Sequence, residues 1–389
     1  MASRSAWLAA PLLLVLLLAF VVPIAAFLLR GVQDAAVAPA FPRTLAALAG
    51  WPGRDLPDLP AWDAVVADLR TARNAGTLLP AAARLNTDVA GLRTVAVVTA
   101  RKIADPFAGS PRDALLAADP AWSQIETWGA IRRAAGSPTD YHLLAALDLR
   151  RDAAGDVRAV PPGQRVFGLV FARTFGVAAL VTAVCLLLGF PVAAFLARRP
   201  GRLSRVLMLA VLLPFWTSLI VRTAAWMVLL ARDGVVNGAL VAVGVFGMPQ
   251  QLLYNRFAVI LAMVHILLPS MILPLHAVMA QVPSALLRAA SSLGAGPVRS
   301  FWRVWLPQTM PGVAAGCVLV FVQALGFYVT PALLGGGADQ MLPWFIGFYA
   351  NQTVDWGLAA ALSLVLLAAI GALAAIWARF GPGLRSLAS

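Results

Sequence analysis

The chain has 389 residues, of which 61% are hydrophobic and 12% are charged, and its mean hydropathy is +0.82. Soluble domains carry about twice that share of charged residues, and they do not contain several apolar runs of more than about 18 residues. The composition therefore excludes a water-soluble protein. The net charge of +13 does not indicate a nucleic-acid partner, because 14 of the 17 acids lie between Asp34 and Asp156 and the excess bases lie between apolar runs.

We predict an all-α integral membrane protein with six membrane-spanning helices, since six apolar segments are long enough to cross a bilayer. The first segment follows Arg4 and is longer than the roughly 7–15 apolar residues of a signal peptide, so we expect a retained signal-anchor helix. The predicted spans are residues 7–29, 167–196, 203–231, 257–279, 312–334 and 357–378.

The distribution of arginines predicts how these spans are oriented, because loops that carry excess Arg and Lys stay in the cytoplasm. Outside the long first loop, the opposite side has mainly Arg30, Arg232 and Arg256. We expect a protein of the bacterial inner (plasma) membrane with both termini in the cytoplasm. The arginines on the cytoplasmic side would be Arg4, Arg198, Arg199, Arg202, Arg205, Arg288, Arg299, Arg303, Arg379 and Arg385.

Three domains are predicted: a first transmembrane helix (1–30), a periplasmic insert (31–165) and a five-helix core (166–381). The insert should be mainly helical, since Trp62, Val65, Val66 and Leu69 recur at helical spacing. A second helical stretch includes Leu85, Val89 and Leu92, and a third includes Trp122 and Ile125. Residues 143–150 and 156–160 flank a plausible hairpin turn. The surface of the insert is either an ordinary solvated face or a docking face for a partner.

The segment between the fourth and fifth spans, residues 281–310, has an unusual composition for a loop. Arginines interrupt it too often for a span, whereas Leu293, Trp302 and Leu306 make it too apolar for a solvated loop. We predict a short helix, a break at Gly294, a second amphipathic stretch and a proline before the next span. On physical grounds such a helix pair either docks on a cytoplasmic partner or lies among lipid headgroups.

This segment resembles the EAA loop of ABC importer permeases, in which E-A-A is followed by three residues, a glycine, nine residues and I-x-L-P. Ala289, Ala290, Gly294, Leu306 and Pro307 match at the family spacing, and Val304 replaces the isoleucine. The family glutamate is Arg288 here, which puts the charge pairing of the loop in doubt. If the partner carries a compensating change, Arg288→Glu should impair assembly or transport.

The resemblance extends over about residues 165–380 and is to permeases of the spermidine/putrescine type. It is carried by the segments 190–196, 213–218 with Arg222, 267–269 and 308–312, and it does not cover the insert. It implies a type I ABC importer fold whose coupling loop fits a groove on the ATP-binding subunit. The coupling residues implied are Arg288, Ala289, Ala290, Leu293, Gly294, Val304, Leu306 and Pro307.

The same resemblance implies the partners: two copies of an ATP-binding subunit, a second permease that forms a heterodimer with this chain, a periplasmic solute-binding protein and the lipid bilayer. The solute would be a polyamine, another organic cation or an amino-acid-like compound. No catalytic residue, metal or cofactor is expected in the chain itself. Its one lysine, Lys102, is not part of a phosphate-binding loop, so a partner subunit would bind and hydrolyse ATP.

Polar and aromatic residues inside the spans are candidates for a pathway or gate, because such groups are costly in lipid. Arg222 is either a gate residue or a structural tie to helix-end carbonyls, and on the direct path it would repel a polyamine. His265 is either a satisfied buried histidine or a solute contact, and Gly312 with Gly316 favours close helix packing. The full candidate set is Trp216, Arg222, Trp226, His265, Gln323 and Tyr328.

Two other function classes remain as alternatives. A secondary transporter or channel would need ion-coupling acids in its spans. Between residues 165 and 389 the only acids are Asp233, Asp339 and Asp355, all at or beyond span ends. A membrane anchor or sensor would need an output domain, and no cytoplasmic segment is long enough to form one.

Overall fold

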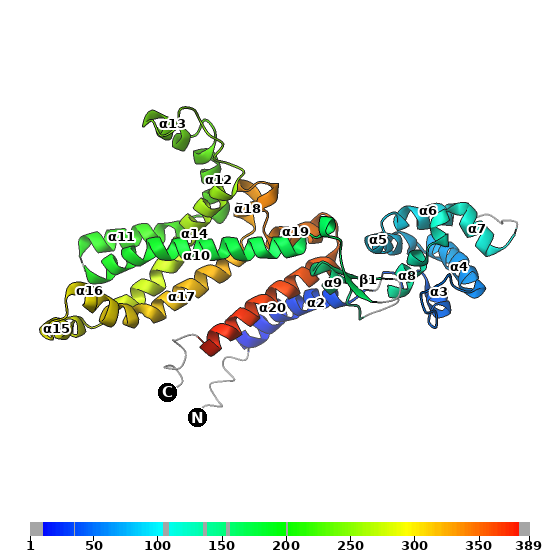
Figure 1. Cartoon of the computed structure of the whole chain (residues 1–389), viewed down its shortest axis with the longest axis horizontal. Coiled ribbons are helices and arrows are strands. Elements are labelled where there is room, and N and C mark those ends of the chain that lie inside the picture. The colour runs from blue at the N-terminus through cyan, green and yellow to red at the C-terminus, as the bar shows by residue number, and fades with distance from the viewer. Residues whose placement is uncertain are drawn as a thin grey trace, which may run out of the picture. The chain divides into compact units, whose positions relative to one another are not determined.

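The computed structural model describes residues 11–34, 36–103, 109–134, 138–152, 156–199 and 201–380. The predicted all-α membrane fold is confirmed: the described residues contain five apolar helices long enough to cross a membrane and a sixth, bent pair (Figure 1). The chain divides into two compact units. Unit 1 comprises residues 1–166 and 349–366, and unit 2 comprises residues 167–348 and 367–389. Arg4, Arg385 and residues 7–10 of the predicted first span lie outside the described residues.

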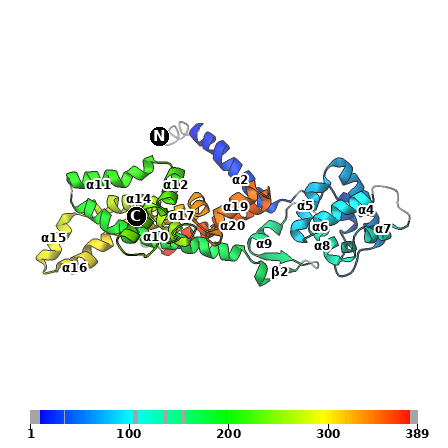
Figure 2. The ribbon, with the colours of Figure 1, turned by 90° about the horizontal axis from the view of Figure 1, so that it is seen from above.

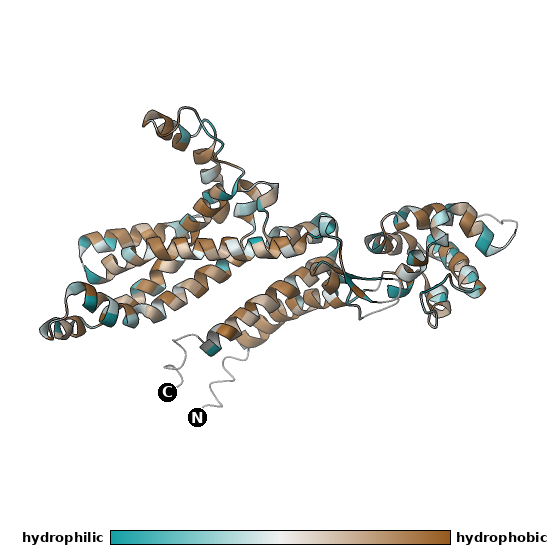
Figure 3. Cartoon of the chain, viewed as in Figure 1, coloured by the Kyte–Doolittle hydropathy of each residue, from teal (hydrophilic) through white to brown (hydrophobic). Residues whose placement is uncertain are grey.

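Three long helices form the core of unit 2: α10 (Phe167–Arg198), α14 (Arg256–Met279) and α17 (Leu306–Leu325). They run side by side and are apolar along most of their length (Figures 1 and 3). Close packing of α17 on α14 depends on two glycines. A Cβ at Gly312 would lie 2.9 Å from the Cβ of Val278, and one at Gly316 would lie 2.8 Å from the Sδ of Met271. The predicted packing role of both glycines is confirmed.

The predicted third span, residues 203–231, is not one continuous helix. The structure has α11 (Arg202–Leu212) with a 3-10 turn η5 (Leu213–Trp216), then a break and α12 (Leu219–Leu230). The bend between the parts Arg202–Trp216 and Leu219–Ala242 is 102°. Thr217 and Ser218 are extended at the break. Pro214 has no N–H for a helical bond, and its carbonyl accepts the hydroxyl of Thr217 at 3.0 Å. The first part, about 22 Å long, is too short to cross the hydrocarbon core of about 30 Å.

The bounds of the predicted fifth span are also wrong. One apolar helix runs from Pro297 to Leu325, so Arg299 and Arg303 lie in its first turns and not in a loop. Its parts are α16 (Pro297–Ser300), a π-helical turn η6 (Phe301–Trp305) and α17. Pro307 cannot donate to the carbonyl four residues earlier, and the wider π turn accommodates it without ending the helix. The helix ends at Leu325, before the predicted Leu334.

The rest of unit 2 consists of shorter elements around this core. Two short helices, α18 (Val329–Leu334) and α19 (Leu342–Asn351, which continues into unit 1), follow α17, with a 3-10 turn η7 (Gly337–Asp339) between them. The main-chain N–H of Leu342 donates to the Oγ1 of Thr174 at 2.9 Å, which holds the beginning of α19 against α10. Helix α13 (Val235–Ala242) follows α12, and α15 (Ser284–Ser292) precedes α16. Helix α20 (Trp356–Phe380) begins in unit 1 and ends in unit 2.

Unit 1 contains the first span and a helical domain that we call the cap domain (α3–α8). The span, Pro11–Val32, includes a π turn η1 (Leu17–Val21), α2 (Val22–Leu29) and a 3-10 turn η2 (Arg30–Val32). The cap helices are α3 (Pro42–Ala47), α4 (Leu59–Ala75), α5 (Leu78–Asp88), α6 (Leu92–Lys102), α7 (Pro111–Ala118) and α8 (Ile125–Arg133), with a 3-10 turn η3 (Pro120–Ser123).

The cap domain has a hydrophobic core of its own. Trp62 packs on Trp128 with ring centroids 4.8 Å apart, and Trp122 packs on Trp128 at 5.5 Å. Each indole N–H has a partner within the domain, such as the Oγ1 of Thr99 for Trp122. The predicted face of Trp62, Val65, Val66 and Leu69 is buried in α4.

The second predicted helical stretch of the insert is not continuous. Helix α5 ends at Asp88 and α6 begins at Leu92, so Val89 lies between them. Gly91 has φ +95°, a left-handed conformation that glycine adopts without strain. The third stretch is likewise divided, with Trp122 in η3 and Ile125 at the beginning of α8.

The predicted hairpin is confirmed, with shorter strands than expected. Strand β1 (Leu149–Arg151) pairs antiparallel with β2 (Val157–Ala159), and residues 153–155 of the turn lie outside the described residues. Residues assigned to the first strand instead form α9 (Tyr141–Ala146), and a 3-10 turn η4 (Pro162–Gln164) follows β2. Figure 2 shows α9 and β2 next to one another.

Candidate coupling and translocation site

The segment that carries the EAA-like pattern forms a helix, a tight turn and a second helix. Helix α15 ends at Ser292, and Gly294 follows with φ +80°. The N–H of Ala295 then donates to the carbonyl of Ala290 at 3.0 Å, closing the turn over the helix end. Only glycine adopts this left-handed conformation at little cost, which explains the glycine at this position of the pattern.

The first half of the segment is exposed in the isolated chain. Helix α15 has no buried residue, and the side chain of Leu293 is 89% exposed. Val298 and Trp302, on the next turns, are 70% and 61% exposed. Exposing a group of apolar side chains to water is unfavourable, so a partner or a lipid surface must cover them.

The second half of the segment is anchored to the core of unit 2. The Trp305 ring is buried, and its centroid lies 5.8 Å from that of Phe190 on α10. The guanidinium of Arg198, at the end of α10, lies 4.1 Å from the centroid of the Trp305 ring. The structure therefore separates the predicted coupling residues: Arg288, Ala289, Leu293, Gly294 and Pro307 are exposed, and Ala290, Val304 and Leu306 are half-buried.

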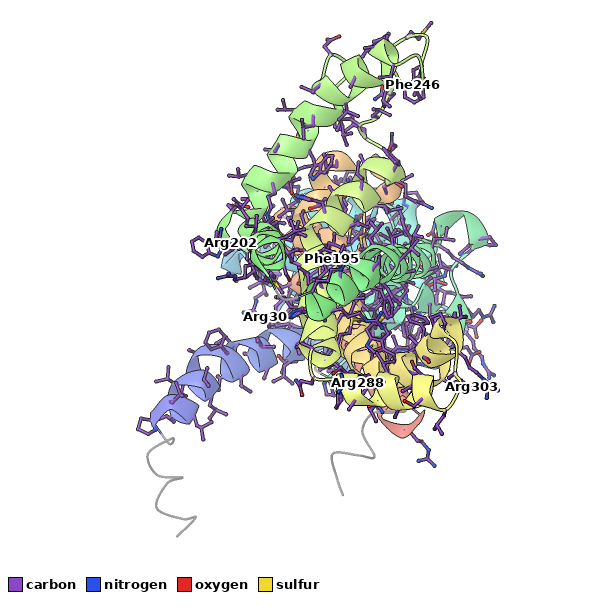
Figure 4. The ribbon with its side chains drawn as sticks, turned by 90° about the vertical axis from the view of Figure 1, so that its left-hand side faces the viewer. Arg30, Phe195, Arg202, Phe246, Arg288 and Arg303 are labelled. Carbon is purple, nitrogen blue, oxygen red and sulfur yellow. The ribbon has the colours of Figure 1, made fainter. Side chains whose placement is uncertain are left out.

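The charge of the segment is entirely positive. Residues 281–310 contain Arg288, Arg299 and Arg303 and no acidic residue. The Nη1 of Arg288 donates to the Oγ of Ser284 at 2.8 Å, and both residues are exposed. Figure 4 shows Arg288 and Arg303 on the same end segment of unit 2. A partner that covers this surface gains from carboxylates opposite these arginines.

Three of the predicted pathway residues lie close together between α12 and α14. The Nε1 of Trp226 donates to the Nδ1 of His265 at 3.2 Å, and the two rings meet edge to face at 5.6 Å. Arg222 lies one turn before Trp226 on α12 and interacts electrostatically with His265. Among the described residues, the buried Nε of Arg222 has no hydrogen-bond partner. His265 is exposed although most residues around it on α14 are buried, so it faces an open side of the bundle.

The other predicted pathway residues do not join this group. Gln323 accepts a hydrogen bond from Ser270 on α14 at 3.1 Å. Tyr328 precedes α18, and a Cβ placed on Gly347 would lie 3.3 Å from its ring. Trp216 stands at the break between α11 and α12 and is 91% exposed.

Two polar links at this site were not predicted from the sequence. Besides Ser270, the structure pairs the hydroxyls of Thr223 on α12 and Thr330 on α18 at 3.2 Å. Both threonines are buried, so the pair ties α12 to the segment after α17. The available signal was a threonine within an apolar stretch at each position. A buried hydroxyl needs a hydrogen-bond partner, so two such threonines are candidates for a pair.

The described residues contain no group of three or more metal-ligating side chains. The chemistry of the site therefore rests on aromatic faces, one arginine, one histidine and hydroxyl or amide groups. Groups of this kind are able to form hydrogen bonds and ring contacts with a solute. No nucleophile–base pair occurs among the polar contacts described above.

Comparisons with known proteins show which family the chain belongs to. The family model of the binding-protein-dependent transport system inner membrane component matches residues 186–385. The spermidine/putrescine transport system permease protein PotB of Escherichia coli (strain K12) is 33% identical over 210 residues, which cover 54% of this chain and 76% of the relative. The inner membrane ABC transporter permease protein YdcU of the same strain is 35% identical over 231 residues, covering 54% and 71%.

Two further proteins are similar to this chain. The molybdenum transport system permease protein ModB of Mycobacterium bovis (strain ATCC BAA-935 / AF2122/97) is 34% identical over 193 residues, covering 49% of this chain and 70% of the relative. A solved bacterial alginate ABC transporter, in complex with an alginate pentasaccharide-bound periplasmic protein, has a TM-score of 0.47 at 18% identity, covering 57% and 82%. The family model begins after the insert, so the cap domain lies outside it.

Proposed function

The chain belongs to the family of binding-protein-dependent transport system inner membrane components, and from this premise we propose that it is the translocation subunit of an ATP-driven polyamine importer. The observation that carries the proposal is the exposed helix pair α15–α16, which bears the EAA-like pattern and presents Leu293, Val298 and Trp302 to a partner. The occupant of this surface is an ATP-binding subunit with an acidic groove. Two copies of that subunit serve one heterodimer of this chain with a second permease.

The orientation follows from where the arginines gather. Arg198, Arg202 and Arg288 lie near the end of α10, the beginning of α11 and on α15, at one end of unit 2 (Figures 1 and 4). An excess of arginine on one side marks the cytoplasmic side. Both chain termini then face the cytoplasm of a bacterium, and the insert faces the periplasm, where a solute-binding protein delivers its cargo.

The structure supports a mechanical route from the ATP-binding subunit to the bundle. Helix α15 follows α14 after four residues, and α16 continues into α17 as one helix. Force on the helix pair therefore reaches α14 and α17 directly, and it reaches α10 through the contact of Trp305 with Phe190. ATP hydrolysis takes place in the partner. The chain is not an enzyme and needs no cofactor of its own.

The polyamine assignment rests on the PotB relative, whose name states spermidine and putrescine as its solutes. The ModB relative, of similar identity, is named for molybdenum, so identity alone does not fix the solute. No acid lies in α10, α11, α12, α14 or α17, and a cation is then met by aromatic faces and by carbonyls that Pro269 and Pro274 leave without a helical donor. Other organic cations or amino-acid-like compounds are the alternative solutes.

Assembly of the purified complex tests the proposal. We expect Leu293→Asp to abolish co-purification of the ATP-binding subunit, because it places a carboxylate against an acidic groove and removes the apolar contact. Leu59→Asp is the matched control, since Leu59 is 62% exposed and lies on the cap domain. Equal recovery of the ATP-binding subunit with both variants would refute the docking role of α15.

Mass spectrometry of the ligand retained by the co-purified binding protein identifies the solute.

A further inference from the structure

A cluster of charged and aromatic residues joins the cap domain to the two spans of unit 1. It combines the second residue after η2, two residues of α5, two residues of α9 and the residue before α20. We call it the junction cluster. Its members are Asp34, Arg84, Asp88, Tyr141, His142 and Asp355.

Arg84 of the cap domain is the centre of the junction cluster. It is 8% exposed, and its Nε lies 2.5 Å from the Oδ2 of Asp34, two residues after the first span. Its guanidinium carbon lies 3.6 Å from the centroid of the Tyr141 ring, and its Nη1 lies 3.6 Å from Asp88. A buried ion pair of this kind contributes little net stability. Removing one partner, however, strongly destabilises the fold, because the other charge stays buried and unpaired.

His142 lies where α9 meets the beginning of α20. It is 5% exposed, and a Cβ placed on Gly357, in the first turn of α20, would overlap the imidazole ring. Its Nδ1 has no hydrogen-bond partner among the described residues. Asp355 caps α20 by accepting the N–H of Leu358 at 2.9 Å. The first span also packs closely here, because a Cβ at Gly31 would lie 2.9 Å from the main-chain nitrogen of Ala361.

The charges that face His142 come from three other segments: Asp355 before α20, Arg84 and Asp88 from α5, and Asp34 after the first span. Burial lowers the pKa of His142 from the ordinary value of 6.5, the three carboxylates act in the opposite direction, and Arg84 adds to the lowering. The ring is therefore neutral in the closed cluster at neutral pH. When the cluster opens, water restores the ordinary pKa.

We propose that the junction cluster is a pH-sensitive joint that fastens the cap domain to the first span and to the beginning of α20. It is closed at neutral pH, and proton uptake by His142 opens it. The cap domain then moves with these two spans during transport at neutral pH and is released from them in acidic surroundings. In a periplasm that follows the pH of the medium, the joint makes the cap domain responsive to external acid.

The direction of the pH effect follows from linkage. The open joint binds the proton more readily than the closed joint, so closure is fully favoured above pH 6.5 and weakens as the pH falls below 6.5. One proton taken up on opening changes the opening constant by up to about tenfold per pH unit. The effect ends at the lower pKa of the closed state.

Hydrogen exchange of the full chain in detergent tests the proposal without any ATP-binding subunit or solute, so its outcome is independent of the transport assignment. Exchange at the C2 carbon of the His142 ring gives its pKa, which we expect below 6.5. Amide exchange reports opening at Thr139, whose N–H donates to the carbonyl of Val32 at 2.8 Å, and at Leu358. After correction for chemical exchange rates, the opening constant should rise up to about fivefold from pH 6.5 to 5.5, because His142 of the open joint is already half protonated at pH 6.5.

Variants separate the role of the proton from a merely structural role. His142→Gln cannot titrate and should lose the pH response, whereas His276→Gln, on α14, should keep it. Gly357→Ala should open the joint at every pH, because its methyl group meets the imidazole. A His142 pKa at or above 6.5, an opening constant that does not change with pH in the wild type, or a full response in His142→Gln would overturn the proposal. If His142→Gln does not fold, the wild-type pKa and opening constant decide alone.

Discussion

The packing of α17 on α14 gives a prediction whose magnitude follows from the structure. In Gly312→Ala the new methyl group would lie 2.9 Å from the Cβ of Val278 and 3.1 Å from the carbonyl oxygen of Pro274. Neither atom is the end of a flexible side chain, so the helices must move apart. Overpacking of this kind costs about 1–3 kcal/mol, and the better helix propensity of alanine returns up to about 1 kcal/mol. We expect a net loss of about 1–2 kcal/mol.

Thermal unfolding of the detergent-purified chain measures this loss. Gly176→Ala is the matched control, because Gly176 lies within α10 and nothing lies within 4 Å of a Cβ built there. The control should be as stable as the wild type or slightly more stable. Gly316→Ala should fall between the two, since the atom it approaches is the flexible sulfur of Met271. The reasoning fails if Gly312→Ala is as stable as Gly176→Ala.

Two further predictions concern the cap domain and the coupling helix. Asp68→Ala should destabilise the cap domain by about 1–3 kcal/mol in thermal unfolding, because the buried N–H and hydroxyl of Thr44 lose the carboxylate that accepts both hydrogen bonds. Asp63→Ala, on the exposed face of α4, is the control and should have no such effect. Equal losses of stability in the two variants would contradict this account. Arg288→Glu should weaken binding of the ATP-binding subunit about tenfold or more in a pull-down without changing chain stability, while Ser284→Ala, which removes only the bond to Arg288, should bind normally. Unchanged or improved binding of Arg288→Glu would exclude an acidic groove.

Hydropathy predicted most of the membrane fold, because long apolar runs have few structural solutions in lipid. The break in the third span was missed although Pro214 marks it, since a proline in an apolar run also occurs within continuous helices, as Pro269 does in α14. The beginning of the fifth span was misplaced for the opposite reason. Pro307 suggested a helix boundary, and the π turn before it keeps the helix continuous.

The sequence pattern predicted the helix, the turn at Gly294 and the second helix, but not which side chains of the segment are exposed. Helical periodicity cannot show that Trp305 turns onto Phe190 while Trp302 stays exposed, because that depends on the position of α10. The junction cluster was out of reach for a related reason. Its members come from Asp34 to Asp355 and meet only when four segments distant in sequence pack together, so no local spacing indicates them.

ATP-dependent uptake by the reconstituted importer tests the central claim most directly. Proteoliposomes should contain this chain with its second permease and ATP-binding subunits, with the binding protein and labelled spermidine or putrescine outside. We predict accumulation of the polyamine only when ATP is enclosed and the binding protein is present, and none when the permease subunit carries Leu293→Asp. Uptake that proceeds without ATP, or equally well through this chain alone, would contradict the assignment.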